Sequence, residues 1–193
     1  MSNSIQATYI CLIKLTTMAT NWTLDGAHSF IGFKVRHMMI SNVNGTFGDF
    51  SATATTEGDD FSTASFTFRA GIDSIHTGVA DRDGHLKSPD FFDAASHPDL
   101  TFVSTGINKI SNEELEITGD LTIRGVSKSI TLKGEFNGIA VDPYGQTKAG
   151  LSINGKIKRS EFGLVWSAVT EAGNIVVGDD ITLNTEIQFI KNN

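Results

Sequence analysis

Apolar and polar residues alternate along most of the chain from Trp22 onward. In the segment 31–36, Ile31, Phe33 and Val35 alternate with glycine and basic residues. This period of two is typical of strands that bury one face. Comparable segments predict strands at 31–36, 47–50, 61–75, 100–104, 115–123, 130–136, 151–157 and 181–189. We therefore expect an all-β protein of eight strands.

The alternation stops between Thr77 and Ala95. Thr77 is a residue type that caps helices, and Asp81 and Asp83 would lie near the positive end of a helix dipole. The segment predicts a short helical insertion between the third and fourth strands.

Glycine-containing pairs predict where the chain turns between strands. Asn44-Gly45 suits the positive φ angles of a type I′ hairpin turn, and Arg124-Gly125 is a second turn. A long loop over residues 160–180 precedes the last strand. Sequential strands of this kind favour an extended, eight-stranded antiparallel barrel. Its interior has room for packed side chains or for one slim ligand, and the apolar pattern alone slightly favours a filled core.

Charge and composition exclude several classes of protein. The 22 acidic and 15 basic residues give a net charge of −7, which should repel nucleic acid and anionic lipid headgroups. No apolar run reaches the roughly 18 residues of a membrane-spanning helix. The single cysteine, Cys11, excludes an internal disulfide, and the five histidines lack zinc-site spacing. We therefore expect no catalytic residue, metal or cofactor.

The N-terminal residues differ from the rest of the chain. Their start carries no basic residue before Lys14, and Lys14 interrupts the short apolar stretch, so residues 1–20 make a poor secretory signal. We interpret residues 1–20 as a disordered extension and residues 21–193 as one barrel domain. This favours the cytoplasm, with export to the periplasm as the alternative.

Five separated strings of residues, within a match over 22–191, resemble those of the YceI family: Phe33-Lys-Val-Arg36-His37-Met38, Val43-Asn-Gly45-Thr-Phe47, Arg82-Asp83-Gly-His85-Leu86-Lys87-Ser88, Gly119-Asp-Leu121-Thr-Ile-Arg124-Gly125 and Arg159-Ser-Glu161-Phe162-Gly163. The resemblance implies a lipocalin-like barrel, commonly a homodimer. It also implies an elongated apolar cavity that accommodates polyisoprenoid or related amphiphilic chains. We therefore predict binding or carriage of a polyisoprenoid, an isoprenoid quinone or a fatty-amide-like lipid in the barrel lumen.

The predicted site has an apolar part and a polar part. The candidates for lining the lumen are Phe33, Val35, Phe66, Phe68, Ile117, Leu121, Ile153 and Leu183. The candidates for contacting a head group are Arg36, His37, Arg82 and His85. For each apolar residue the alternative is ordinary core packing, and for Asp83 we favour a contact that fixes the helix to the first strand. Two other functions stay open: a metal-dependent or acid–base enzyme acting on such a lipid, and a filled barrel that binds other proteins.

Overall fold

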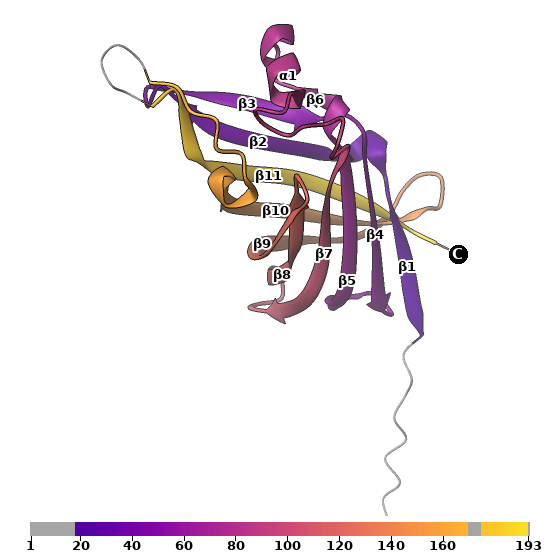
Figure 1. Ribbon diagram of the computed structural model, residues 1–193. Helices are drawn as coiled ribbons and strands as arrows, with labels where there is room; N and C mark the ends of the chain where they lie inside the picture. The colour runs from indigo at the N-terminus through magenta and orange to yellow at the C-terminus, as the bar shows by residue number, and fades with distance from the viewer. Residues whose placement is uncertain (1–17, 170–174, 193) are drawn as a thin grey trace, which may run out of the picture.

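The computed structural model describes residues 18–169 and 175–192, so that residues 1–17 of the predicted extension lie outside the described residues. The described residues form one antiparallel sheet (Figure 1). Its strands are β1 (Ala19–Leu24), β2 (Phe30–His37), β3 (Ser41–Phe47), β4 (Phe50–Glu57), β5 (Asp60–Gly71), β6 (Ile75–His76), β7 (Asp99–Lys109), β8 (Glu114–Ile123), β9 (Val126–Val141), β10 (Thr147–Lys158) and β11 (Val177–Lys191). The helical segments are η1 (Gly26–His28), η2 (Ile72–Ser74), α1 (Ala80–Lys87) and η3 (Arg159–Phe162).

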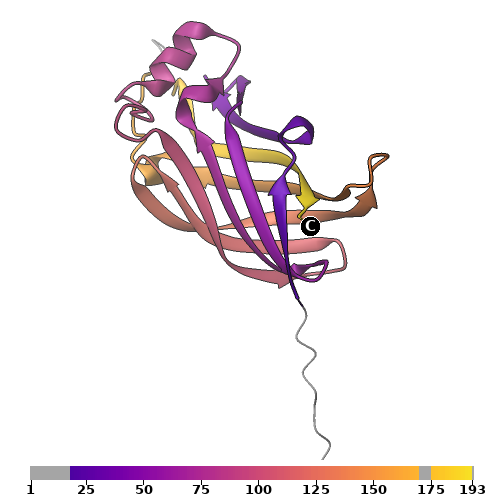
Figure 2. The same cartoon turned by 90° about the vertical axis from the view of Figure 1, so that its right-hand side faces the viewer.

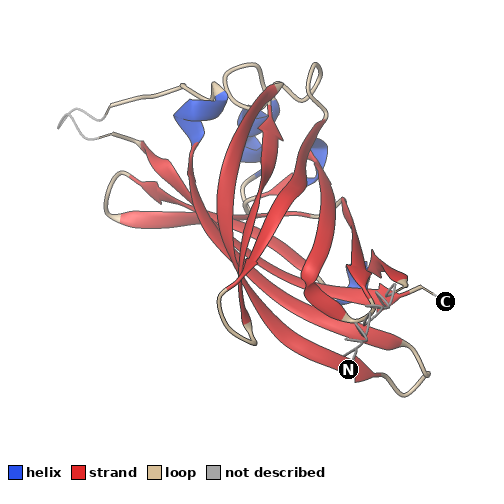
Figure 3. Ribbon diagram, turned by 90° about the horizontal axis from the view of Figure 1, so that it is seen from below, coloured by secondary structure: helices blue, strands red, loops and turns tan. Residues whose placement is uncertain are grey.

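Eight of these strands close a barrel, which confirms the predicted architecture. They follow the order β1-β4-β5-β7-β8-β9-β10-β11, and β11 pairs with β1 through Thr23 and Ile190 to close the ring. Strands form the wall all the way round, and the helices are short segments at its margins (Figure 3). The remaining strands, β2, β3 and β6, extend the sheet at one end, where β2 pairs with β11 through Phe33 and Leu183. At that end β2 takes the place of β1 along the same edge of β11, so that β2 and β3 continue the wall.

The break between β1 and β2 was not predicted. Asp25 caps the short helix η1 by accepting a hydrogen bond from the Ala27 backbone N–H at 3.2 Å. The same carboxylate accepts a hydrogen bond from Lys148 Nζ at 2.7 Å, which lowers the pKa of Asp25. Ala19 and Thr20, assigned by the sequence to the extension, belong to β1. Because η1 separates β1 from β2, β1 pairs with the C-terminal end of β11 and β2 pairs with the preceding part of the same strand.

The predicted turn at Asn44-Gly45 is wrong. Both residues lie inside β3, where Gly45 pairs with Phe33 of β2. The chain reverses instead at Met38 and Met39, whose φ angles are 49° and 62°. The Phe33 ring occupies the space over Gly45, so that a glycine is needed there for close approach rather than for a turn. By contrast, the predicted turn at Arg124-Gly125 is confirmed, because these two residues join β8 to β9.

Helix α1 forms the predicted insertion and lies above one end of the barrel (Figures 1 and 2). Its N-cap is Val79 and not Thr77. Thr77 instead donates its hydroxyl and its backbone N–H, the latter at 2.8 Å, to the carboxylate of Asp83. His76 of β6 lies 3.3 Å from the same carboxylate. Asp83 therefore fixes the helix as expected, although its partners lie beside β6 rather than on the first strand.

Candidate functional site

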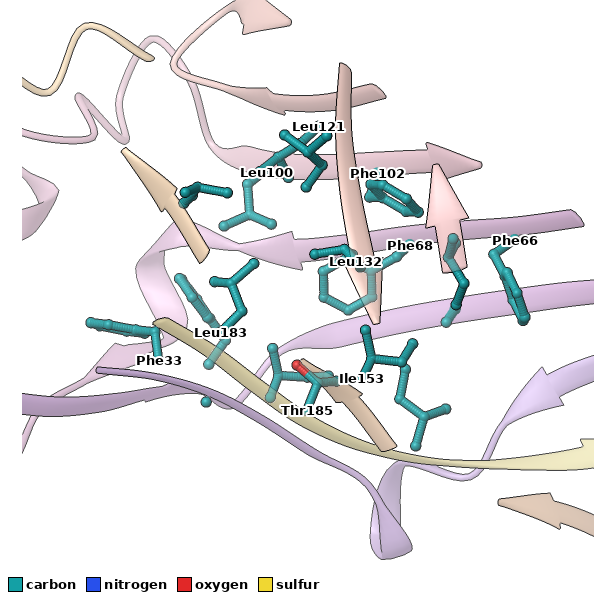
Figure 4. A pocket seen from close by; sticks show the side chains of 18 of the residues that line it. Phe33, Phe66, Phe68, Leu100, Phe102, Leu121, Leu132, Ile153, Leu183 and Thr185 are labelled. Carbon is teal, nitrogen blue, oxygen red and sulfur yellow. The ribbon is translucent and has the colours of Figure 1, made fainter. Parts of the chain in front are cut away.

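A cavity lined by apolar side chains lies inside the barrel (Figure 4). The volume of this cavity is about 120 Å³, and the polar residues in its lining are limited to Thr67 and Thr185. Seven of the predicted lumen residues line it: Phe33, Phe66, Phe68, Ile117, Leu121, Ile153 and Leu183. The core is therefore not completely filled, whereas the apolar pattern alone slightly favoured a filled core.

One end of this lumen is closed by aromatic side chains. Trp22 and Phe61 have ring centroids 5.0 Å apart, and Phe61 stacks on Phe136 at 5.1 Å. Phe189, which lines the lumen, packs against both Phe61 and Phe66. These rings close the end opposite the helix α1.

A second chamber continues the lumen toward α1. Its volume is about 100 Å³, and it shares Phe33 and Leu183 with the first chamber. Val35, the eighth predicted lumen residue, lines this chamber. Its roof comes from the helical insertion, through Leu86, Phe91 and Phe92. The sequence did not indicate these three residues, because the insertion lacks the strand periodicity that identified the others.

A third compartment, which we call the vestibule, brings together all four predicted head-group residues. Arg36 and His37 come from β2, whereas Arg82 and His85 come from α1. The vestibule offers about 180 Å³ and shares Phe33, Val35, Leu86, Phe91 and Val177 with the second chamber. None of the described residues that line it is Asp or Glu. Three neighbouring compartments that share lining residues therefore extend from the closed end of the barrel to the vestibule, which is lined by cationic and imidazole side chains.

Arg82 is held in place at the vestibule wall. Its Nε donates to the Thr77 hydroxyl at 2.7 Å, and its Nη2 donates to the Thr77 carbonyl oxygen at 2.8 Å. Because Thr77 also binds Asp83, the guanidinium is part of a hydrogen-bonded group that begins with β6 and ends on α1. This fixes a positive charge beside the vestibule, in a position to meet a polar head group.

His85 packs against two aromatic rings. Its imidazole makes edge-to-face contacts with Phe91 and Trp166, with centroids 5.0 Å apart in both pairs, and these two rings lie 5.2 Å from each other. Its Nε2 lies 3.0 Å from a carboxylate oxygen of Asp90. The orientation of the imidazole is therefore fixed by this aromatic cluster and by a polar partner.

Trp166 lines the vestibule from the loop before β11, and its position depends on Arg159. Arg159 Nη1 donates to the carbonyl oxygens of Leu164 and Trp166, the latter at 2.8 Å, and its Nε donates to the carbonyl of Gly178 at 3.0 Å. Burial lowers the pKa of this guanidinium. The sequence placed Arg159 in a family-like string but assigned residues 160–180 to a loop, and it did not predict that Arg159 binds the carbonyl oxygens of that loop.

The residues that the structure describes contain no group of three His, Cys, Asp or Glu side chains placed to hold a metal ion. Their helices include none that is both long enough and apolar enough to cross a membrane.

Comparisons with known proteins agree with this architecture. A family model described as the YceI-like domain matches residues 22–189. A UPF0312 protein of Staphylococcus aureus is 35% identical over 171 residues, which cover 88% of this chain and 97% of that protein. The solved structure of a Campylobacter jejuni YCEI protein is 40% identical, with a TM-score of 0.71, and the match covers 88% of this chain and 96% of that chain.

A more distant structure shares the fold. It is a polyisoprenoid binding domain from Saccharophagus degradans, implicated in plant cell wall breakdown. It is 14% identical, with a TM-score of 0.67, and the match covers 89% of this chain and 98% of that domain.

Proposed function

Because the chain belongs to the YceI family, we propose that it binds a long apolar amphiphile in the barrel lumen. The ligand is a polyisoprenoid, an isoprenoid quinone or a fatty-amide-like lipid. The observation that carries this proposal is the series of three neighbouring compartments, two of them apolar, that share lining residues between the aromatic closed end and the vestibule. The Saccharophagus domain, which is named for polyisoprenoid binding, supports the same class of ligand. The role is binding and carriage rather than catalysis.

The lining suits a chain with no polar groups along its length. Each CH₂ removed from water contributes about 0.8 kcal/mol, and no hydrogen bond is needed along the chain. A polar head group in the lumen would lose its hydrogen bonds to water, at a cost of roughly 1–3 kcal/mol or more. The head therefore stays in the vestibule, where Arg36, Arg82 and the imidazoles of His37 and His85 supply donors.

Native mass spectrometry of the purified protein, followed by organic extraction of what it carries, tests the proposal. The wild type should carry a stoichiometric amphiphile. Ile153→Trp adds bulk inside the lumen and should release it. Val103→Trp is the matched control, because Val103 is half exposed on the outside of β7.

Thermal unfolding of both variants separates loss of ligand from loss of fold. A wild-type protein that is empty, and that also takes up no added isoprenoid or quinone, would overturn the proposal. So would an Ile153→Trp variant that is folded and fully loaded.

A further inference from the structure

Five aromatic side chains fill the barrel at the end opposite α1, and we call them the aromatic stop: Trp22, Phe61, Phe66, Phe136 and Phe189. Phe61 is at the centre, because its ring centroid lies 5.0 to 6.4 Å from those of the other four. The side chains of Trp22, Phe61 and Phe189 are at most 2% exposed. Aromatic pairs in such contact contribute more than their buried area alone. This end of the barrel is therefore sealed by a packed group of rings and not by one side chain.

Two members of the aromatic stop form the floor of the lumen. Phe66 and Phe189 line the lumen, and their rings stack with centroids 6.1 Å apart. Phe61 lies in contact with both of them. Figure 4 shows Phe66 at one end of the lining and Phe33 at the other, with Phe102 between them. The tail of a chain that fills the lumen would therefore end against Phe66 and Phe189.

The barrel wall beside the aromatic stop carries small residues. Ala54 pairs with both Trp22 and Phe66, and Ala149 pairs with Phe189. Both alanines are at most 2% exposed. An eight-stranded barrel closes its interior only when large side chains fill it, so that alanines alone would leave this end open. The rings and not the wall therefore end the lumen, and a smaller side chain in place of one ring would lengthen it.

The aromatic stop is anchored on its outer side. The Trp22 indole N–H donates to the Thr56 hydroxyl at 2.9 Å, and this hydroxyl donates to the Gly58 carbonyl oxygen at 2.6 Å. Lys191 Nζ lies 5.7 Å from the Trp22 ring centroid and 2.7 Å from a carboxylate oxygen of Asp59. Because a buried N–H that leaves its acceptor loses a hydrogen bond without replacement, the indole does not swing aside for a longer chain.

The two ends of the series of compartments differ in polarity. The vestibule carries Arg36 and Arg82, whereas the aromatic stop presents only rings to the lumen. A polar head group stays at the vestibule, because the lumen offers it no hydrogen bonds. The chain therefore enters from the vestibule with its tail first. Strand β11 runs from Val177 in the vestibule to Phe189 in the aromatic stop, and these twelve steps span at most about 40 Å of extended strand.

We propose that the aromatic stop sets the length of the apolar chain that the protein accepts, and that Phe66 is the residue that meets the tail. A chain shorter than the lumen leaves apolar space unfilled. A chain longer than the lumen keeps part of its length in water or draws its head away from the vestibule. Affinity therefore rises with chain length up to an optimum and gains nothing beyond it. This inference rests on the proposed function, since it specifies which members of that class of amphiphile bind best.

Native mass spectrometry of the delipidated protein, mixed with an equimolar series of prenols from farnesol to decaprenol, tests the aromatic stop. The mass of each complex identifies the length of the bound prenol. Phe66→Ala removes the ring that meets the tail, so that the preferred prenol should lengthen by at least one isoprene unit. The first prenol longer than the wild-type optimum should gain at least about tenfold in affinity, because two further buried CH₂ groups are worth that much.

Phe102→Ala is the matched control. It removes the same ring from the side of the lumen, between the two ends, and so widens the lumen without lengthening it (Figure 4). Its preferred prenol should be that of the wild type. Phe66→Leu is a milder second variant, in case Phe66→Ala does not fold, and it should shift the preference in the same direction by a smaller amount. Thermal unfolding identifies the variants that are folded.

Three results would overturn the aromatic stop as the determinant of chain length. They are a folded Phe66→Ala or Phe66→Leu variant with the wild-type preference, a Phe102→Ala variant that shifts the preference equally, and a wild-type affinity that rises across the whole series. In each of these cases the protein still binds prenols, so that the proposed function stands. A wild type that binds none of the prenols would contradict the proposed function, and the aromatic stop with it.

Discussion

Replacing Gly45 by alanine should disturb the passage between the two apolar chambers. Gly45 lies opposite Phe33, whose ring lines both chambers and the vestibule. A Cβ at position 45 would lie 2.2, 2.6 and 2.9 Å from three atoms of that ring. These distances are too short for carbon atoms in contact, so that the Phe33 ring has to move. The backbone at Gly45 does not have a positive φ, and alanine is otherwise compatible with the strand.

The expected cost follows from the overlap. Overpacking a well-packed site typically costs about 1–3 kcal/mol. The lower conformational entropy of alanine in the unfolded chain offsets roughly 0.4–1 kcal/mol of this. For a domain of this size each remaining kcal/mol lowers Tm by about 2–4 °C. Because the displaced ring narrows the passage, the amount of amphiphile that co-purifies should fall as well.

Thermal unfolding and lipid extraction measure both effects. The control is Gly106→Ala in β7, where a Cβ would meet nothing within 4 Å. Combining Gly45→Ala with Phe33→Leu should recover much of the lost stability, because the smaller side chain leaves room for the new methyl group. The reasoning is refuted if Gly45→Ala leaves Tm and lipid content unchanged, or if the two substitutions act independently.

Three further predictions concern the polar contacts that hold the barrel and its roof. Thr56→Val removes the buried hydroxyl that accepts a hydrogen bond from the Trp22 indole N–H at 2.9 Å. The free energy of unfolding, measured with denaturant, should fall by about 1–3 kcal/mol. A fall smaller than that caused by Thr53→Val, at an exposed position of the same strand, would contradict this. The Thr77 hydroxyl lowers the pKa of Asp83 from its usual 3.8, so that its contribution is present above about pH 4 and is lost as the pH falls through the lower folded value. The protection of the α1 amides, which is their exchange rate relative to the intrinsic rate at the same pH, should therefore fall in acid, and Asp83→Asn should abolish that fall; an unchanged protection profile counts against the assignment. Arg159→Met leaves several backbone carbonyls without their donor and should reduce Trp166 fluorescence anisotropy, whereas Arg124→Met, which loses one carbonyl contact, should change it less. Equal anisotropy in the two variants would show that Arg159 does not position the loop.

The barrel and its inward-facing residues were predictable because the strand repeat is local. Alternation fixes which residues share a face, and all eight predicted lumen residues line the lumen or the second chamber. The meeting of Arg82 and His85 followed from their helical spacing of three residues. Their proximity to Arg36 and His37 followed from the family resemblance and from the position of the insertion, and the structure places the four around one vestibule.

The features that the sequence missed depend on distant contacts. The Asn44-Gly45 pair has the residues of a turn, yet Gly45 is required by the ring of Phe33. The break before β2 depends on Asp25 reaching Lys148, which lies 123 positions away in the chain. Trp166 belongs to a loop without any repeat and is placed by Arg159. A local pattern carries no information about such partners.

A crystal structure of the protein purified with its amphiphile tests the central claim most directly. The account predicts continuous electron density along the lumen from the Phe189 end, past Leu121 and Phe33, with the head group within hydrogen-bonding distance of Arg82 or His85. Density for the amphiphile outside the barrel, with the lumen closed by its own side chains, would contradict it.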